Sequence, residues 1–90
     1  MNSYRQIIVK GRVQGVGFRF HSQKQATKLN IQGYVKNLAN GDVEILAYGD
    51  QDAVQQFMAW CRQGPERANV AEIVVIEQDR NEVFAGFEIR

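Results

Sequence analysis

The first part of the chain shows a strand-like pattern followed by a helix-like one. From Tyr4 to Val13, β-branched residues are mixed with polar ones, which is typical of a strand, and Gly15 and Gly17 then predict a tight loop. No glycine or proline occurs between Phe18 and Asn30, where small and apolar residues recur at helical spacing. We expect a helix whose buried face carries Phe18, Ser22, Ala26 and Leu29. It should end at Asn30, because asparagine tolerates the left-handed conformation that closes many helices.

Two further strand-like runs follow, at Gly33–Leu38 and Val43–Tyr48. The residues that separate them are Ala39, Asn40, Gly41 and Asp42. An Asn-Gly pair between such runs predicts a hairpin, because both residues accept the positive φ of a tight turn. In the second run, Val43, Ile45 and Ala47 alternate with Glu44, Leu46 and Tyr48. We therefore expect one face of this hairpin to be buried.

The clearest helix pattern extends from about Gln51 to Gln63. Asp50 precedes it as a candidate N-cap, and Gly64 and Pro65 follow its last turn. Its apolar stripe consists of Val54, Phe57, Met58 and Cys61. A stripe at this spacing is typical of a core-facing helix, so we interpret Cys61 as a small buried hydrophobe rather than a nucleophile.

The end of the chain predicts two more strands. Ala71–Glu77 is an apolar run, and Phe87–Ile89 is a shorter one after a polar stretch around Asp79–Glu82. The resulting order, βαββαβ with a short final strand, is the ferredoxin-like split βαβ pattern. We expect an α+β fold in which two helices cover one face of an antiparallel sheet. With 90 residues and 44% hydrophobic content, the chain is long enough for one core, so we expect a single domain over residues 1–90.

Several classes of protein are disfavoured by what the sequence lacks. Its apolar runs are far shorter than the ~20 residues of a membrane-spanning helix, and its first residues do not resemble a secretory leader. Cys61 has no second cysteine to pair with, and one thiol with one histidine is too little for a usual zinc site. We therefore expect a cytoplasmic protein that needs no membrane, metal or cofactor.

Charge is distributed unevenly along the chain, although its formal net charge is only +1. The first 41 residues hold no acid, whereas the rest of the chain holds ten acids and four arginines. The basic residues of the first part are Arg5, Lys10, Arg12, Arg19, Lys24, Lys28 and Lys36. An anionic partner should therefore meet the first half of the sequence, and this partner class includes nucleic acid.

The loop between the first strand and the first helix is a candidate phosphate site. Gly15 and Gly17 allow successive backbone N–H groups to converge on one point, and the helix N-terminus adds partial positive charge. Glycines after a strand are also common turn formers, so the pattern alone is weak. Arg19 strengthens the phosphate interpretation. A cation in the first turn of a helix destabilises the helix by ~0.3–1 kcal/mol because it opposes the helix dipole, and a phosphate ligand would explain why a cation is present there. The alternative is a solvated arginine.

Asn37 is the second candidate residue, since an asparagine is unusual inside a strand. The pattern by itself favours an exposed polar residue at a strand end. A functional role needs other support.

Two long motifs supply that support. The first is the run Val9-Lys10-Gly11-Arg12-Val13-Gln14-Gly15-Val16-Gly17-Phe18-Arg19. The second is Gly33-Tyr34-Val35-Lys36-Asn37, followed after a gap by Gly41-Asp42-Val43 and then Gly49. In both motifs the sequence resembles the acylphosphatases, and the resemblance extends over nearly the whole chain. The departures, Asn30 where glycine is common and Glu66 where a second proline is common, concern loop geometry.

The resemblance implies hydrolysis of the carboxyl-phosphate bond of small acyl phosphates, giving a carboxylate and inorganic phosphate without metal or covalent intermediate. It implies that Arg19 binds the phosphoryl group together with backbone amides of Gly15, Val16, Gly17, Phe18 and Arg19. It also implies that Asn37 positions the attacking water. We expect a phosphate oxygen of the substrate, rather than His21, to take the proton of that water.

Two other functions fit the same fold. A ferredoxin-like domain can bind RNA, but the Gly17-Phe18-Arg19-Phe20 sequence falls at a helix start instead of on a central strand, where stacking aromatics are needed. A non-catalytic phosphate sensor is the second alternative, since fold does not decide function. We expect a monomeric enzyme that binds no nucleic acid.

Overall fold

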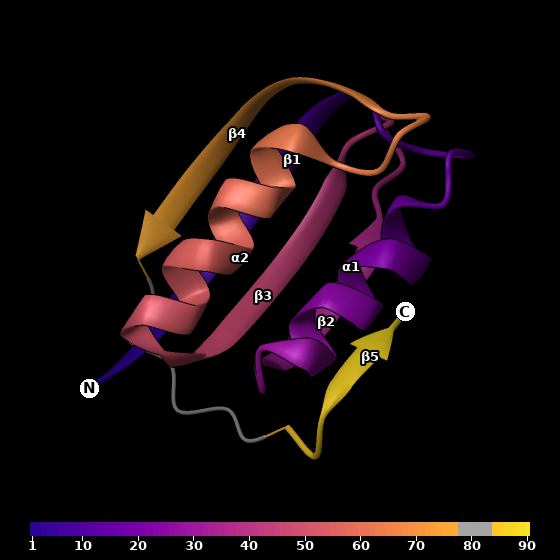
Figure 1. Ribbon diagram of the computed structural model, residues 1–90. Helices are drawn as coiled ribbons and strands as arrows, with labels where there is room; N and C mark the ends of the chain where they lie inside the picture. Colours follow the sequence, from indigo (N-terminus) through magenta and orange to yellow (C-terminus); the bar gives the residue numbers. More distant parts are fainter. Residues whose placement is uncertain (78–83) are drawn as a thin grey trace.

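The computed structural model describes residues 1–77 and 84–90, and its elements follow the predicted order (Figure 1). They are β1 (Asn2–Arg12), α1 (Phe18–Lys28), β2 (Gln32–Asn37), β3 (Val43–Asp50), α2 (Gln51–Gln63), β4 (Asn69–Glu77) and β5 (Phe87–Ile89). The polar stretch expected around Asp79–Glu82 lies outside the described residues.

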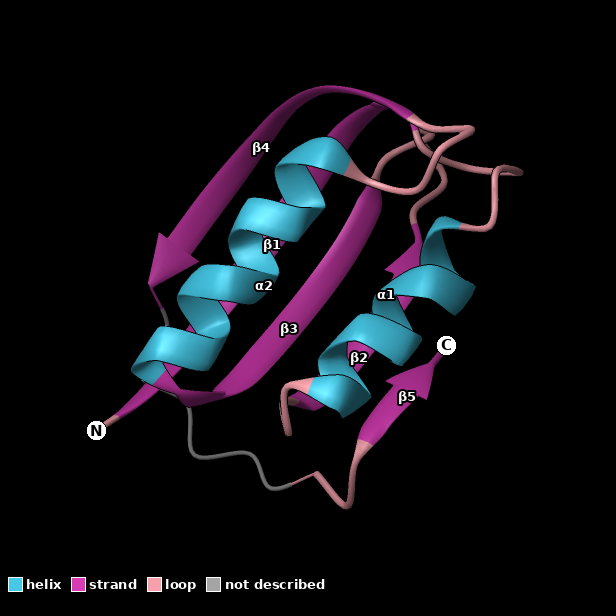
Figure 2. Ribbon diagram, viewed as in Figure 1, coloured by secondary structure: helices cyan, strands magenta, loops and turns pink. Residues whose placement is uncertain are grey.

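The strands form one sheet in the order β4-β1-β3-β2-β5, and both helices lie on the same face of it (Figure 2). This arrangement confirms the predicted α+β, ferredoxin-like fold. One detail of the prediction is wrong, because the sheet is mixed rather than fully antiparallel. The β4–β1, β1–β3 and β3–β2 pairs are antiparallel, whereas β5 runs parallel to β2.

The register of the strands explains the direction of β5. Glu77, the last residue of β4, pairs with Arg5, close to where Tyr4 of β1 pairs with Tyr48 of β3. Tyr48 also pairs with Gln32 at the start of β2. The chain therefore leaves β4 at the end of the sheet where β2 begins. A strand added beyond β2 from that end must run in the direction of β2.

Helix α2 packs its apolar stripe against the sheet, as its periodicity predicted. Val54, Phe57 and Cys61 are fully buried, and they join one core with residues of β1 and β3 such as Ile7 and Ile45. The helix begins as expected, since the Asp50 carboxylate accepts a hydrogen bond of 3.1 Å from the backbone N–H of Asp52.

Helix α1 is less amphipathic, and its buried face is narrow. Phe18, Ser22 and Ala26 are buried as predicted, while Leu29 is half-buried. The buried Ser22 hydroxyl donates a hydrogen bond of 2.9 Å to the Arg19 carbonyl oxygen, which satisfies it inside the core. Asn30 has a φ of 58°, the left-handed conformation expected at the end of this helix.

The face of the sheet away from the helices is covered in part. Val43, Ile45 and Ala47 are buried under the helices, which confirms the predicted inner face of the hairpin. On the opposite face Leu46 is also buried, together with Tyr4, Tyr34 and Phe84 in a second cluster. Successive side chains of β3 therefore point alternately into two buried clusters, one on each face of the sheet, and neither face of this strand is fully exposed.

Candidate active site

The loop between β1 and α1 has the conformation that the glycines predicted. Gly15 and Gly17 have φ angles of 72° and 79°, and Gly17 occupies the N-cap position of α1. A Cβ at Gly15 would meet no atom within 4 Å, so the left-handed φ is what requires glycine there. No side chain caps the helix at Gly17, so its first-turn N–H groups are left for a ligand.

A pocket of about 210 Å³ opens beside this loop. Its walls are formed by Val13, Gly15, Gly17, Phe18, Arg19, Phe20, Asn37 and Ile89. Arg19 and Asn37, the two residues singled out from the sequence, thus meet in one place although they belong to α1 and β2. Val16 is the exception among the predicted residues, because its buried side chain lines a neighbouring groove instead.

Arg19 is half-buried and is held from the far end of the chain. Its Nη1 donates a hydrogen bond of 3.3 Å to the main-chain carbonyl oxygen of Arg90. Arg90 is in turn fixed by a bond of 2.8 Å from its N–H to the carbonyl oxygen of Val35 in β2. Within residues 1–77 and 84–90, Arg19 makes no ion pair, so its charge is available to an anion in the pocket.

Asn37 is the last residue of β2 and its side chain is exposed. Among the described residues, no hydrogen bond occupies its amide. The hairpin that follows is closed by a bond of 2.8 Å from the Leu38 N–H to the Asp42 carbonyl oxygen. This closure confirms the predicted turn and holds the end of β2 in place beside the pocket.

Gln14 is a residue whose role sequence reasoning missed. Its Nε2 donates hydrogen bonds of 2.8 Å to the Leu38 carbonyl oxygen and 2.9 Å to the Asp42 carbonyl oxygen. These bonds tie the loop that leads into α1, and so to Arg19, to the hairpin that follows Asn37. The available signal was the presence of Gln14 inside the first motif, because a side chain with two N–H donors can bridge two carbonyl groups.

Ion pairs neutralise some of the basic residues of the first half of the chain. Arg5, Lys10 and Lys36 pair with Glu77, Asp42 and Glu44 at 3.7, 2.8 and 3.6 Å. The hydrogen bond with Asp42 raises the pKa of Lys10 above its usual value. The basic residues of the first half that form no ion pair within the described ranges are Arg12, Arg19, Lys24 and Lys28.

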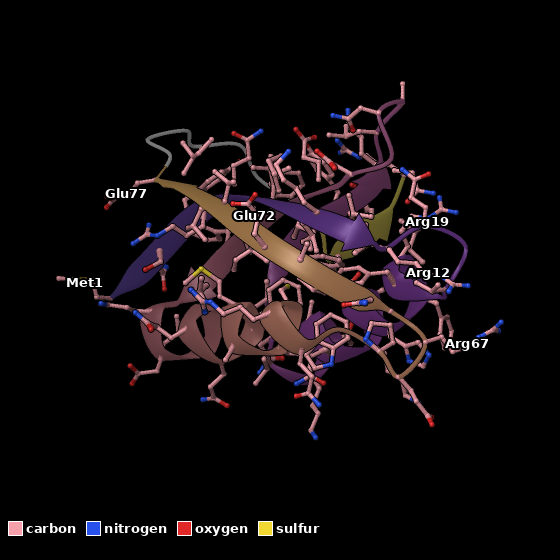
Figure 3. All side chains as sticks on the ribbon, turned by 90° about the horizontal axis from the view of Figure 1, so that it is seen from above. Met1, Arg12, Arg19, Arg67, Glu72 and Glu77 are labelled. Atoms are coloured by element: carbon pink, nitrogen blue, oxygen red, sulfur yellow. The ribbon has the colours of Figure 1, made fainter. Side chains whose placement is uncertain are left out.

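Three arginines lie at the end of the molecule that holds the pocket. Figure 3 shows Arg12, Arg19 and Arg67 at one end, with Met1 and Glu77 at the opposite end. None of the described residues that line the pocket is acidic. An anion approaching this end therefore meets a positive field and no fixed negative charge inside the pocket.

Other candidate nucleophiles and bases lie outside the pocket. His21 lines the neighbouring groove. Cys61 is fully buried, and burial raises the pKa of its thiol, which keeps it in the unreactive protonated form. The described part of the chain contains no group of three His, Cys, Asp or Glu side chains placed to hold a metal ion. Neither helix is long and apolar enough to cross a membrane, as far as the described residues show.

Several known proteins match this chain over most of its length. The family model for acylphosphatases matches residues 5–89. An acylphosphatase from Vibrio parahaemolyticus serotype O3:K6 (strain RIMD 2210633) is 50% identical over 82 residues, which cover 91% of this chain and 90% of that protein.

Solved structures agree with the sequence comparison. An acylphosphatase from Bacillus subtilis is 44% identical with a TM-score of 0.92, covering 100% of this chain and 99% of that one. An acylphosphatase from Coxiella burnetii is 36% identical with a TM-score of 0.93, covering 99% and 93%. Because the match spans almost the whole sequence at this level of identity, the chain belongs to the acylphosphatase family.

Proposed function

We propose that this protein hydrolyses the carboxyl-phosphate bond of small acyl phosphates. The products are a carboxylate and inorganic phosphate. The observation that carries the proposal is the meeting of Arg19 and Asn37 in one pocket with the glycines of the β1–α1 loop. Membership in the acylphosphatase family supports the same reaction.

In this proposal, the phosphoryl group lies against the backbone amides of Gly15, Val16, Gly17, Phe18 and Arg19. The Arg19 guanidinium adds two parallel charge-assisted hydrogen bonds, which match the geometry of two phosphate oxygens. Most of the catalytic effect then comes from positioning and from electrostatic stabilisation of the transferring group.

The attacking water is oriented by the side-chain amide of Asn37. A neutral amide suits this position, because a carboxylate would repel a substrate that already carries negative charge. The water oxygen forms a bond to phosphorus while the bond from phosphorus to the acyl oxygen breaks. The departing carboxylate is stable without an added proton, so no general acid is required. The proton released by the water passes to a phosphate oxygen of the substrate.

A phosphate-release assay tests the reaction. We expect the protein to hydrolyse acetyl phosphate and benzoyl phosphate in the presence of EDTA, and to leave p-nitrophenyl phosphate, an ordinary ester, intact. Arg62→Ala is the matched control for Arg19→Ala, because Arg62 is an exposed arginine of α2 outside the pocket. Salt-sensitive retention of RNA without any hydrolysis would instead favour a binding module.

We further propose that the protein works as a monomer in the cytoplasm. The proposed reaction uses the loop glycines, Arg19 and Asn37, which this chain itself supplies, so the reaction calls on no residue of a partner. Light scattering of the purified protein at working concentration checks the oligomeric state, and a dimer that dissociates with loss of activity would overturn it.

A further inference from the structure

A second and larger concave site lies between the two helices. It has a volume of about 520 Å³ and is bounded on one side by α1 and on the other by α2 and the segment that follows it. Lys24 and Lys28 come from α1, Trp60 from α2, and Arg67 from the segment after α2. We name this site the interhelical groove.

The side of α1 that faces this groove is basic. Packing of the two helices does not explain why lysines are found there. Helices that lie together on a sheet usually bury apolar side chains between them. Lys24 and Lys28 are instead four residues apart on one helix, where like charges repel. Within residues 1–77 and 84–90, neither lysine nor Arg67 makes an ion pair. Glu66 is the acid among the described residues that line the groove.

Trp60 adds a fixed aromatic surface to these cations. Its indole ring is half-buried, and the Phe57 ring lies nearly parallel to it, with 18° between the planes and 6.1 Å between the centroids. Phe18 contacts the same indole at 5.4 Å between centroids. The ring is therefore held in one orientation by the core and leaves part of its surface to the groove. A rigid ring beside several cations suits a ligand that carries both a planar group and negative charge.

We propose that the interhelical groove binds an organic anion of the size and chemistry of a nucleoside diphosphate. The planar base would lie against Trp60, and the phosphates would lie among Lys24, Lys28 and Arg67. The groove volume falls within the range of about 300–1,000 Å³ that is usual for small-molecule sites. This binding goes beyond the proposed hydrolysis and does not depend on it.

The groove is separate from the active-site pocket, although the two share one wall. Val16 lines the groove, whereas Gly15 and Gly17 on either side of it line the pocket. Arg19 belongs to the pocket alone. Ligand binding in the groove should therefore survive both the loss of Arg19 and the filling of the pocket by inorganic phosphate.

The fluorescence of Trp60 gives a direct test, because it is the single tryptophan of the chain. Titration with ADP, excited at the red edge of tryptophan absorption, is expected to give a saturable quench. The quench should persist in Arg19→Ala and in the presence of saturating inorganic phosphate. Adenosine, which lacks the charges, should bind at least about tenfold more weakly, since the cations would contribute nothing to it.

Charge variants locate the site. Lys24→Gln and Lys28→Gln should each weaken ADP binding by about fivefold, the size of effect expected when one exposed charge contact is lost. Arg62→Gln removes one positive charge from the nearby helix outside the groove and should leave ADP binding unchanged.

Four results would overturn the proposal. The first three are the absence of a saturable signal at millimolar ADP, displacement of ADP by inorganic phosphate, and equal weakening by Arg62→Gln and Lys28→Gln. Binding of single-stranded RNA with no binding of ADP would likewise reject a small-molecule site. The hydrolysis assay is independent of all four results, so it can fail or succeed separately.

Discussion

Gln14 holds Leu38, the residue directly after Asn37, through a hydrogen bond of 2.8 Å to its carbonyl oxygen. Its second hydrogen bond is donated to the Asp42 carbonyl oxygen, at the other end of the same turn. One side-chain amide therefore joins the loop that leads into α1 and Arg19 to the turn that directly follows Asn37. The relative position of the two catalytic candidates depends on this link.

Loss of the link should slow turnover more than it weakens binding. We expect Gln14→Ala to lower kcat by about ten- to a hundredfold, because a displacement of ~1 Å can have an effect of this size. Inorganic phosphate should inhibit Gln14→Ala as it inhibits the parent protein, since the loop amides remain. A Gln14→Glu variant should be at least as slow, because a carboxylate cannot donate to either carbonyl. A change in KM alone would show that Gln14 has no positioning role.

Removal of the Arg19 guanidinium should weaken phosphate binding and slow turnover strongly. We expect Arg19→Ala to lose about 10²–10³ in kcat/KM and to lose inhibition by inorganic phosphate. Arg19→Lys keeps the charge but not the two parallel donors, so it should recover only part of the activity. Steady-state kinetics on benzoyl phosphate measures both variants, with Arg62→Ala as the matched control. Full activity in Arg19→Ala would remove this residue from the mechanism.

Asn37 is expected to affect the chemical step and not the binding of phosphate. Asn37→Ala should lower kcat by about a hundredfold while inhibition by inorganic phosphate stays within about twofold. Asn37→Asp has nearly the same shape but places a negative charge beside the substrate, so it should weaken phosphate inhibition as well. Turnover that is unchanged in Asn37→Ala would show that the water is oriented by another group.

The Lys10–Asp42 pair predicts a pH dependence of stability at the alkaline end. Because Asp42 raises the pKa of Lys10 in the folded protein above its ordinary value of 10.5, the pair stabilises the fold fully below that pH. The contribution is lost as the pH rises through the raised pKa. The difference in urea midpoint between the parent protein and Lys10→Gln should therefore be constant from pH 7 to 9 and disappear at higher pH. A difference that persists at every pH would mean that the charge of Lys10 is irrelevant.

A backbone substitution in β2 tests how closely the strands approach. Gly33 has a φ of 142°, and a Cβ there would collide with the carbonyl oxygen of Leu46 in β3. We expect Gly33→Ala to lower the free energy of unfolding by more than ~2 kcal/mol. Gly86→Ala is the control, because a Cβ at Gly86 would meet no atom of residues 1–77 or 84–90 within 4 Å. Equal thermal midpoints for the two variants would contradict this account.

Local patterns predicted most of the fold. Helix α2 has the bounds expected from its apolar period and its Asp50 cap, and Asn30 has the positive φ expected at the end of α1. The parallel direction of β5 was missed, because it follows from the end of the sheet at which β4 stops. The periodicity of the sequence does not indicate at which end of the sheet β4 stops.

The sequence predicted only those site residues whose side-chain chemistry points to a role in the reaction. Arg19 and Asn37 were singled out, and the structure brings them to one pocket. Gln14 was missed because its function is a pair of hydrogen bonds to main-chain carbonyls, which any residues at those positions would offer. The part played by Ile89 was missed for a related reason, since only the pairing of β5 with β2 brings it to the pocket.

The parallel pairing of β5 also determines when the pocket can be complete during protein synthesis. Ile89 forms part of its wall and the Arg90 carbonyl oxygen receives the Arg19 hydrogen bond, yet the ribosome adds these residues after every other part of the pocket. A nascent chain that stops at β4 already contains Arg19, Asn37 and the glycine loop but has an open side. Covering the exposed edge of β2 and completing the pocket wall therefore both wait for β5 and are a single late event.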